Sequence, residues 1–575
     1  MSFVKIFYFA ATIIFALEIS QIICDAFKVI ETDVGAVRGL KKTTFWKKVD
    51  YYSFKGIPYA EKPIAKLRFK PPKPIKPWNS TILDAFEFGN KCIQLGSISL
   101  DSYVESEDCL FLNIYSPADL KPNEKVPVLF FIHGGGYVEG SGNDDIYGPD
   151  FIIEKRVILV TFNYRLNIFG FLSLNSSEYS GNMGLKDQQL ALKWIHTNIK
   201  YFNGDNNKIT IFGGSAGSVS TQLHILSAES RKYFQNAIAM SGTVYNYWAM
   251  SQYDNHLEIA YEMAKEFEKP TVQFDKLVDI LLSESPENIT KSLVSRISID
   301  RTLSSLFGPV IEISSAVQPF MTESINDLYD TQDINITTMF SVTSAEMLHY
   351  ATHHYPIIAD IDGLNANFFI KLPFRDLNVA SDSEEYHSLN DAIRQFYFGN
   401  DSIDVSKSTE YIALLSDINF FYGIDKIAKL HATKSKARTF YVRFSVDSKL
   451  NIFKRLYSKF ECAGAAHADD LGYLFRVNIG KRFYDDVFET LDDEQSKISI
   501  QTIDFMTDFV TQFPNIEKIE FKPIQNIEIN FLDITNEGLK PGMSPNARAM
   551  EFWSNIEKRI RNYVDCRQNI EHKEL

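Results

Sequence analysis

The sequence of 575 residues lacks a composition shift, a charge block or a Pro/Gly/Ser-rich linker that would divide it. It also lacks low-complexity tracts and internal repeats. Because separate domains are normally joined by such linkers, we expect one large domain with insertions. Hydrophobic residues make up 45% of the chain and aromatic residues 14%, which is enough for a sizeable core.

Basic charge is also scarce, since 59 Lys and Arg face 73 Asp and Glu, for a net charge of -14. This excess of negative charge argues against nucleic acid or an anionic membrane surface as a partner. No second long hydrophobic span follows the N-terminal one, and no GPI-type tail is found. We therefore expect a soluble mature protein with no membrane span.

The first hydrophobic run predicts a secretory signal peptide. Lys5 precedes an apolar stretch at residues 6–17 (IFYFAATIIFAL), which is short for a membrane span but typical of a signal core. A buried core helix is the alternative. We expect residues 1–24 to be removed, near Cys24 or Ala26, which leaves a single domain over residues 25–575.

Other features agree with entry into the secretory pathway. The last four residues, His572 to Leu575, read HKEL, which is close to the KDEL/HDEL retention address and predicts a retention receptor as partner. We expect the endoplasmic reticulum lumen; secretion, with an ordinary charged tail, is the alternative. Five N-x-[ST] sites are candidates for glycosylation: Asn79, Asn175, Asn288, Asn335 and Asn400.

Five cysteines are present, and Cys24 is expected to leave with the signal peptide. Cys92 and Cys109 are spaced for a small disulfide loop, worth about 3 kcal/mol in an oxidising lumen. Cys462 and Cys566 have no obvious partner.

The hydrophobic pattern predicts an α/β fold with a large, mostly parallel central sheet covered by helices on both faces. Residues 26–30 and 34–38 alternate and indicate an antiparallel edge, whereas residues 54–60 are interpreted as a proline-broken loop. A helical pattern at residues 185–202 separates the last two of four continuous apolar runs, which are typical of strands buried on both faces: 110–115, 126–132, 157–162 and 209–212.

The second half of the chain is predicted to return to this sheet after a long insertion. Residues 251–436 are mostly helical in pattern and are expected to cover the active-site cleft. Late strands are predicted at residues 439–444 and 527–532, and an amphipathic helix at residues 546–566.

The sequence around Ser215 predicts a nucleophile. Residues 209–220 (ITIFGGSAGSVS) place Ser215 between a short strand and a helix, flanked by Gly213 and Gly217. This is the setting of a G-x-S-x-G elbow, whose sharp turn exposes the serine hydroxyl at the carboxyl end of a strand. The pattern alone is weak, because such triplets arise by chance.

A second glycine-rich turn offers an oxyanion hole. The motif HGGGY (133–137) follows a predicted buried strand, so backbone N–H groups free of side chains can converge beside the serine. We expect the N–H groups of Gly135, Gly136 and Ala216 to form the oxyanion hole. A flexible turn is the alternative interpretation.

A base and an acid complete the candidate set. His467 lies in a small-residue loop, GAAHADDL, from which an imidazole can reach a cleft, although loop histidines are often simply surface residues. Glu346 follows a predicted strand end, which is suitable but common among so many carboxylates. The order Ser215, Glu346, His467 matches the Ser, Asp/Glu, His order of α/β-hydrolases.

Taken together, the chain resembles the type-B carboxylesterases, the cholinesterase-like α/β-hydrolases, and within them the insect carboxylesterases. The resemblance is carried by FKGIPYA (54–60), EDCLFLNIY (107–115), HGGGY (133–137), NYRLNIFGFL (163–172), GNMGLKDQQLALKWI (181–195), FGGSAGS (212–218), AMSGT (239–243) and AGAAHADDLGYLF (463–475). It implies an α/β-hydrolase fold, a small-molecule ester substrate and no metal or cofactor.

The resemblance also assigns residues. It implies Glu346 as the triad acid, His467 as the base, the Cys92–Cys109 disulfide, and Trp248 and Tyr137 in the substrate pocket, with ordinary core as the alternative for Trp248. Three departures stand out: Asn167 replaces a usual glycine, Met347 follows the acid in place of glycine, and no tryptophan lies between the two cysteines. Without that tryptophan a quaternary ammonium lacks its cation-π partner, which argues against an acetylcholinesterase.

The sequence therefore predicts a serine carboxylesterase that works through an acyl-enzyme. A specialised hormone or pheromone esterase would share this chemistry and differ in its pocket. A noncatalytic adhesion protein of the same fold is the alternative from another class.

Overall fold

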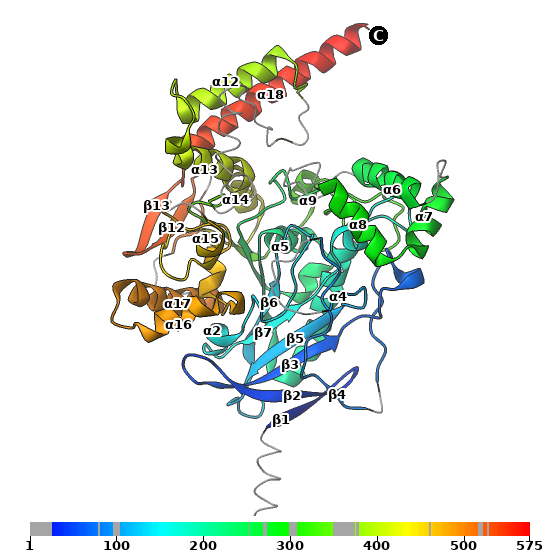
Figure 1. Cartoon of the computed structure of the whole chain (residues 1–575), viewed down its shortest axis with the longest axis vertical. Coiled ribbons are helices and arrows are strands. Elements are labelled where there is room, and N and C mark those ends of the chain that lie inside the picture. The colour runs from blue at the N-terminus through cyan, green and yellow to red at the C-terminus, as the bar shows by residue number, and fades with distance from the viewer. Residues whose placement is uncertain are drawn as a thin grey trace, which may run out of the picture.

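The computed structural model describes most of the chain after the expected signal peptide (Figure 1). The described residues are 26–78, 81–95, 104–251, 253–267, 273–297, 307–348, 374, 379–458, 462–515, 521–525 and 528–574. The predicted signal peptide, residues 1–24, lies outside this part of the chain.

A single twisted sheet of 13 strands organises the molecule, in the order β1-β2-β3-β5-β7-β6-β8-β9-β10-β11-β12-β13, with β4 beside β2. Its strands are β1 (Phe27–Thr32), β2 (Gly35–Thr43), β3 (Asp50–Pro58), β4 (Leu83–Asp84), β5 (Phe111–Pro117), β6 (Val126–Ile132), β7 (Ile158–Phe162), β8 (Gly204–Gly214), β9 (Asn236–Met240), β10 (Thr337–Thr343), β11 (Thr439–Phe444), β12 (Asn530–Thr535) and β13 (Gly538–Met543).

The strands run parallel from β7 through β6, β8, β9, β10 and β11 to β12. The pairs β1/β2, β2/β3, β3/β5 and β5/β7 are antiparallel, as is the closing hairpin β12/β13. The predicted mostly parallel sheet with an antiparallel N-terminal edge is confirmed.

The expectation of a loop at residues 54–60 was wrong, because residues 54–58 complete β3. The register of β3 shifts between Phe54 and Ile57, and Gly56 there has a φ of 68°. A bulge of this kind lets the strand continue past its glycine. Pro58 is tolerated because it is the last residue of the strand.

The sheet is covered on both faces, which explains its continuous apolar strands. On β8, Ile211 belongs to the core under α4 and α5, whereas its neighbour Phe212 belongs to the core under α17. Successive side chains of a strand point to opposite faces, so both must be apolar here. The covering helices are α2 (Asp150–Ile153), α3 (Asn167–Phe171), α4 (Met183–Asn198), α5 (Ala216–Leu226), α15 (Ile452–Tyr457), α16 (Lys481–Glu489) and α17 (Glu494–Gln512).

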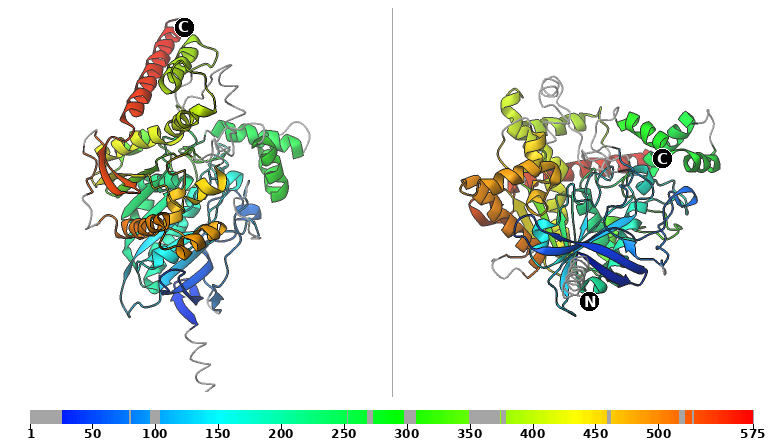
Figure 2. Two further views of the ribbon diagram at one scale, coloured as in Figure 1. Left: turned by 60° about the vertical axis from the view of Figure 1, so that its left-hand side comes forward. Right: turned by 60° about the horizontal axis from the view of Figure 1, so that its bottom comes forward.

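The long insertion forms helices at the end of the molecule away from β1 (Figures 1 and 2). One group stands to the side and contains α6 (Tyr253–Phe267), α7 (Phe274–Ser283) and α8 (Pro286–Ile297). The remainder are α9 (Ile325–Thr331), α12 (Glu384–Phe398), α13 (Ser408–Ser416) and α14 (Tyr422–Lys434).

The C-terminal helix is longer than the predicted 546–566, since α18 runs over Ala547–Glu574. It lies beside α12, and the two project together from the body (Figure 2). Phe396 stacks on Phe552 at 4.1 Å between ring centroids, and Arg559 pairs with Glu385 at 2.6 Å. Helix α18 is thus held by a partner from the insertion.

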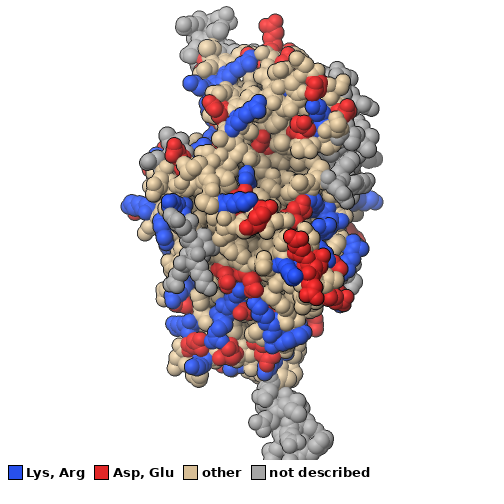
Figure 3. Space-filling view, turned by 90° about the vertical axis from the view of Figure 1, so that its left-hand side faces the viewer, with Lys and Arg blue, Asp and Glu red and all other residues tan. Residues whose placement is uncertain are grey.

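Charged side chains of both signs lie on the surface. On the face in Figure 3, acidic and basic side chains are interspersed. No helix among the described residues is both long enough and apolar enough to span a bilayer.

Candidate active site

Ser215 stands at the turn between β8 and α5, with φ 58° and ψ -124°. A Cβ on Gly213 would lie 2.5 Å from the backbone of Gly217, and one on Gly217 would lie 2.0 Å from the carbonyl oxygen of Ile132. Only glycine fits where strand and helix cross this closely. Close backbone packing therefore determines the shape of the elbow. Ser215, at its turn, has a strained backbone conformation.

The neighbouring strand β9 fixes this turn in place. The Ser215 N–H donates to the carbonyl oxygen of Met240 at 2.8 Å. On α5, the Ser218 hydroxyl donates to the carbonyl oxygen of Gly242 at 2.6 Å. These two bonds tie the start of α5 to the end of β9.

The candidate base and acid are in direct contact. His467 Nδ1 lies 2.7 Å from Glu346 Oε2, and the His467 backbone N–H donates to the Glu346 carbonyl oxygen at 3.0 Å. The two side chains come from loops after β11 and β10, which are adjacent parallel strands. Glu346 is 0% exposed and His467 5% exposed, so water screens their interaction little.

The second carboxylate oxygen of Glu346 is held as well. Oε1 accepts from the Ser241 hydroxyl at 2.6 Å and from the Thr343 backbone N–H at 2.8 Å. These hydrogen bonds fix the direction in which the carboxyl group meets the imidazole.

Ser215 and His467 border the same cleft, whose volume is about 880 Å³, part of it open to solvent. The glycine-rich loop borders it too, through Gly134 and Gly135, and Leu471 and Phe453 form apolar parts of the wall. Its polar lining residues are Lys91, Gln94, Glu139, Ser141, Asp145, Ser241 and Asp470.

The predicted oxyanion donors lie in two neighbouring turns. Gly135 and Gly136 have φ of 102° and 60°, a region that favours glycine. A Cβ on Gly134 would lie 3.0 Å from the Ser215 Cβ, so the loop passes close beside the elbow. Gly135 borders the cleft; Gly136 and Ala216 are not among its lining residues. Within the described chain, the N–H groups of these two glycines and of Ala216 have no hydrogen-bond acceptor.

His133, the first residue of the HGGGY motif, contacts this loop through its side chain. Its ring stacks on Tyr164 at 4.3 Å, and its Nδ1 lies 2.8 Å from the Gly134 carbonyl oxygen. Burial lowers the pKa of His133 to about 4, so the imidazole is neutral at pH 7 and Nδ1 donates to that carbonyl.

Asp470 contributes a buried carboxyl to the cleft wall. Burial, and then the negative charge of Glu346, raise its pKa to about 7. The site therefore contains a group that is partly protonated near neutral pH.

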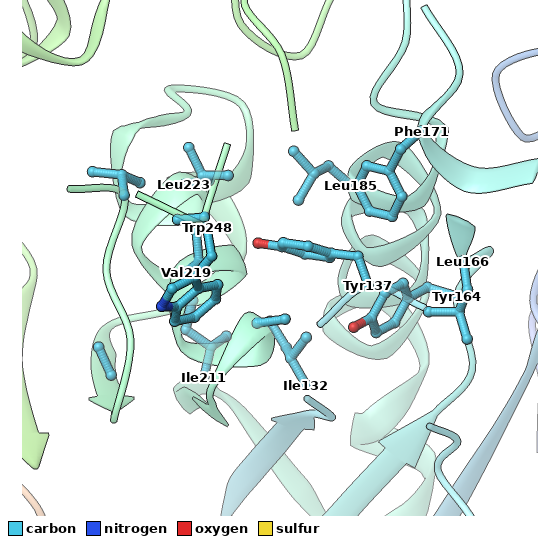
Figure 4. Close-up of a cluster of buried hydrophobic side chains, with 14 of the residues drawn as sticks. Ile132, Tyr137, Tyr164, Leu166, Phe171, Leu185, Ile211, Val219, Leu223 and Trp248 are labelled. Atoms are coloured by element: carbon cyan, nitrogen blue, oxygen red, sulfur yellow. The ribbon is translucent and has the colours of Figure 1, made fainter. Parts of the chain in front are cut away.

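The two predicted pocket residues lie in the core beside the elbow (Figure 4). The Tyr137 hydroxyl points toward Trp248, between Leu185 and Val219. The Trp248 indole N–H donates to the Asn419 carbonyl oxygen at 2.8 Å. Neither residue is among those that line the cleft around Ser215, and their role in substrate binding stays a prediction.

The structure describes the predicted disulfide and most of the candidate glycosylation sites. Cys92 and Cys109 form a disulfide, and Cys462 and Cys566 are free. Of the candidate glycosylation sites, Asn175, Asn288, Asn335 and Asn400 are exposed, and glycosylation itself stays a prediction. Asn79 and Leu575 of the tail lie outside the described residues.

Sequence reasoning missed two neighbours of the histidine and the acid. Ser241, which binds Glu346, belongs to the quoted motif AMSGT, but nothing in that motif indicated its role. Phe420, whose ring lies 4.7 Å from the His467 ring, comes from a π-helical turn at Asp417–Phe421 within the insertion, and no sequence signal indicated it.

Comparison with known proteins agrees with this geometry. The sequence pattern described as "Carboxylesterase family" matches residues 26–553. The chain belongs to this carboxylesterase family. It is 31% identical over 546 residues to a carboxylic ester hydrolase of Bombus ignitus, covering 92% of this chain and 94% of that protein. It is 34% identical over 451 residues to a juvenile hormone esterase of Tribolium castaneum, covering 74% of each.

A solved structure supports the fold of this carboxylesterase family member. The crystal structure of juvenile hormone esterase from Manduca sexta, with OTFP covalently attached, superposes with a TM-score of 0.81 at 27% identity. The match covers 92% of this chain and all of that one. The α/β-hydrolase fold and the carboxylic ester hydrolase class are thus established, with small-molecule esters as substrates.

Proposed function

We propose that this carboxylesterase works through Ser215 as nucleophile, His467 as general base and Glu346 as the acid that orients it. The observation that carries the proposal is the 2.7 Å contact between His467 Nδ1 and Glu346 Oε2 beside a cleft that also contains Ser215. A serine hydroxyl is a weak nucleophile at neutral pH, so it needs such a base.

In the acylation step, His467 Nε2 removes the hydroxyl proton as Ser215 Oγ attacks the ester carbonyl carbon. The N–H groups of Gly135, Gly136 and Ala216 hold the oxyanion that forms. When the tetrahedral intermediate collapses, the ester C–O bond breaks and the alcohol leaves with the proton from His467. Glu346 offsets the positive charge that the imidazole carries in between.

Deacylation repeats the sequence with water. His467 takes a proton from the water, whose oxygen attacks the acyl carbon, and returns it to Ser215 Oγ as the carboxylic acid departs. Both steps need only the protein groups, the ester and water.

The test is labelling and turnover in one set of variants. Ser215→Ala is expected to abolish labelling by a fluorophosphonate and hydrolysis of a p-nitrophenyl ester. Ser220→Ala is the matched control, because Ser220 lies on the same helix and is 0% exposed, so it is out of reach of the reagents. Retained turnover in Ser215→Ala would refute the nucleophile.

A specialised hormone esterase is a second candidate, favoured by the similarity to two juvenile hormone esterases. The discriminating measurement is kcat/KM for juvenile hormone against that for a naphthyl ester. A noncatalytic role is disfavoured, because all three residue types of the triad are kept and two of them are in contact.

We also propose that HKEL retains the protein in the endoplasmic reticulum lumen. The support is the likeness of these four residues to known retention addresses. Deleting residues 573–575 is expected to move the expressed protein into the medium, and an unchanged distribution would refute retention.

A further inference from the structure

The loop that carries the oxyanion glycines, residues 134–140, is held from outside by the segment that follows Cys92. We call residues 93–95 the disulfide segment, because the Cys92–Cys109 bond fixes its start. The Leu95 N–H donates to the Val138 carbonyl oxygen at 3.0 Å. This bond connects the two segments although they are far apart in sequence.

Gln94 adds a paired contact to the same loop. Its Nε2 donates to the Gly140 carbonyl oxygen at 2.7 Å, and its Oε1 accepts from the Gly140 N–H at 3.1 Å. One side-chain amide therefore satisfies both backbone groups of Gly140, and Gln94 is 8% exposed. The loop end is fixed at a point five residues from Gly135.

Asn167 joins both segments from a third element, at the start of α3. Its backbone N–H donates to the Tyr137 carbonyl oxygen at 2.7 Å, and its side-chain Nδ2 donates to the Ile93 carbonyl oxygen at 2.8 Å. Asn167 is 0% exposed, and its φ is 45°. Asparagine tolerates this left-handed conformation, but glycine adopts it more easily. Asparagine adds two contacts over glycine: the bond to Ile93, and a longer one in which its Oδ1 accepts from the Phe169 N–H at 3.4 Å.

We propose that Asn167 and Gln94 are positioning residues that hold the oxyanion loop against the disulfide segment, so that the N–H groups of Gly135 and Gly136 keep a fixed direction. The inference rests on the proposed ester hydrolysis. Donors aimed at a developing oxyanion act only if they do not reorganise during the reaction. A loop tied at residues 137, 138 and 140 meets this requirement.

The decisive variant is Asn167→Gly, which keeps the φ of 45° accessible and removes the bond to Ile93 together with the Oδ1 acceptor of the Phe169 N–H. Because Asn167 does not border the cleft, KM for a p-nitrophenyl ester is expected to stay within about twofold. We expect kcat to fall roughly 10- to 100-fold, since small misplacements of catalytic groups cost this much. A purely structural role would lower the melting temperature and leave kcat of the folded enzyme unchanged.

Asn203→Gly is the matched control. Asn203 is also left-handed, with φ 67°, and its Nδ2 donates to a backbone carbonyl, that of Glu124, at 3.0 Å. It lies at the start of β8, at the other end of that strand from Ser215. We expect Asn203→Gly to leave both kcat and KM unchanged.

Hydrogen exchange of the peptide that spans residues 134–140 gives a readout independent of activity. Faster exchange in Asn167→Gly than in wild type, with no change in Asn203→Gly, supports the proposal even if no ester is turned over, in which case only the proposed function fails. Unchanged kcat together with unchanged exchange in Asn167→Gly overturns the inference and leaves the ester hydrolysis standing. Gln94→Met is expected to speed exchange in the same peptide.

Discussion

The parallel and antiparallel parts of the sheet differ in what they supply to the site. The loops after β6, β8, β10 and β11 carry the oxyanion glycines, Ser215, Glu346 and His467. The antiparallel strands β1, β2, β3 and β5 carry none of the proposed catalytic residues.

The difference follows from strand direction. Parallel strands all end at one edge, so side chains that follow different strands meet there. Antiparallel strands end at alternating edges, and residues that follow them are separated. The proposed chemistry is therefore concentrated at one edge. The connection between β4 and β5 reaches this edge through the disulfide segment and through Lys91, which also borders the cleft.

Among the variants that test this comparison, Glu346→Gln at the parallel edge is expected to lower kcat most. The amide keeps the volume but presents an N–H to His467 Nδ1, which favours the wrong tautomer of the imidazole. We expect kcat to fall about 10²- to 10⁴-fold. Steady-state kinetics of the folded variant check this, and a wild-type rate would show that another carboxylate is the acid.

Gly217→Ala tests the sterics of the elbow. The added Cβ would lie 2.0 Å from the Ile132 carbonyl oxygen, so strand and helix must separate. We expect a loss of about 1–3 kcal/mol in the free energy of unfolding, with reduced kcat. Gly214→Ala is the control, since its Cβ would meet nothing closer than Leu471 at 3.6 Å. Equal losses in the two variants would contradict the steric explanation.

Phe54→Ala tests the antiparallel part. Phe54 is 1% exposed and packs edge-on against Phe202 at 5.0 Å. Its truncation is expected to cost about 3–5 kcal/mol of stability, because a cavity remains. The kcat of the molecules that stay folded should match wild type. A lowered kcat below the unfolding transition would mean that the antiparallel part also shapes the site.

A smaller effect, on the pH dependence of the melting temperature, is expected from Asp470→Asn. The folded-state pKa of Asp470 is raised to about 7, above the value of about 3.9 in an unfolded chain. Its contribution to stability is therefore complete below pH 4 and is lost as pH rises through 7. We expect Asp470→Asn to melt above wild type at pH 8 and level with it at pH 4.

Asp84→Asn is the comparison for this pH dependence in the antiparallel part. A hydrogen bond from Arg38 lowers the pKa of the exposed Asp84 carboxyl, so its effect has the opposite sign. Because the pair is exposed, the melting temperature should change little at any pH. A gain for Asp84→Asn at pH 8 as large as that for Asp470→Asn would contradict the burial argument.

Much of the fold could be predicted from the sequence. The predicted strands at residues 126–132 and 439–444 coincide with β6 and β11, because continuous apolar runs mark strands buried on both faces. The prediction of a loop at residues 54–58 was wrong, since glycine and proline are usual in loops, whereas here the strand accommodates them through a bulge and at its last residue. Local pattern does not reveal a bulge that depends on a neighbouring strand.

The proposed site could be predicted from the sequence wherever the local turn alone determines the position of a residue. Ser215 and the oxyanion glycines stand in short motifs whose glycines are required sterically. His467 and Glu346 were only weak candidates from their loops and their order in the chain, and the resemblance assigned their roles, because their contact is made between loops of two strands that are about 100 residues apart in sequence. The contacts of Ser241, Phe420 and Asn167 depend wholly on tertiary packing, which no local pattern encodes.

Strand β9 has a consequence for how activity is lost. Its last residue, Met240, accepts from the Ser215 N–H, and the next residue, Ser241, donates to Glu346. The proposed nucleophile and the proposed acid are therefore both held by the same two adjacent residues. Heating that displaces these two residues disturbs both partners at once, so thermal inactivation should be a single step, with loss of fluorophosphonate labelling and loss of turnover following the same curve.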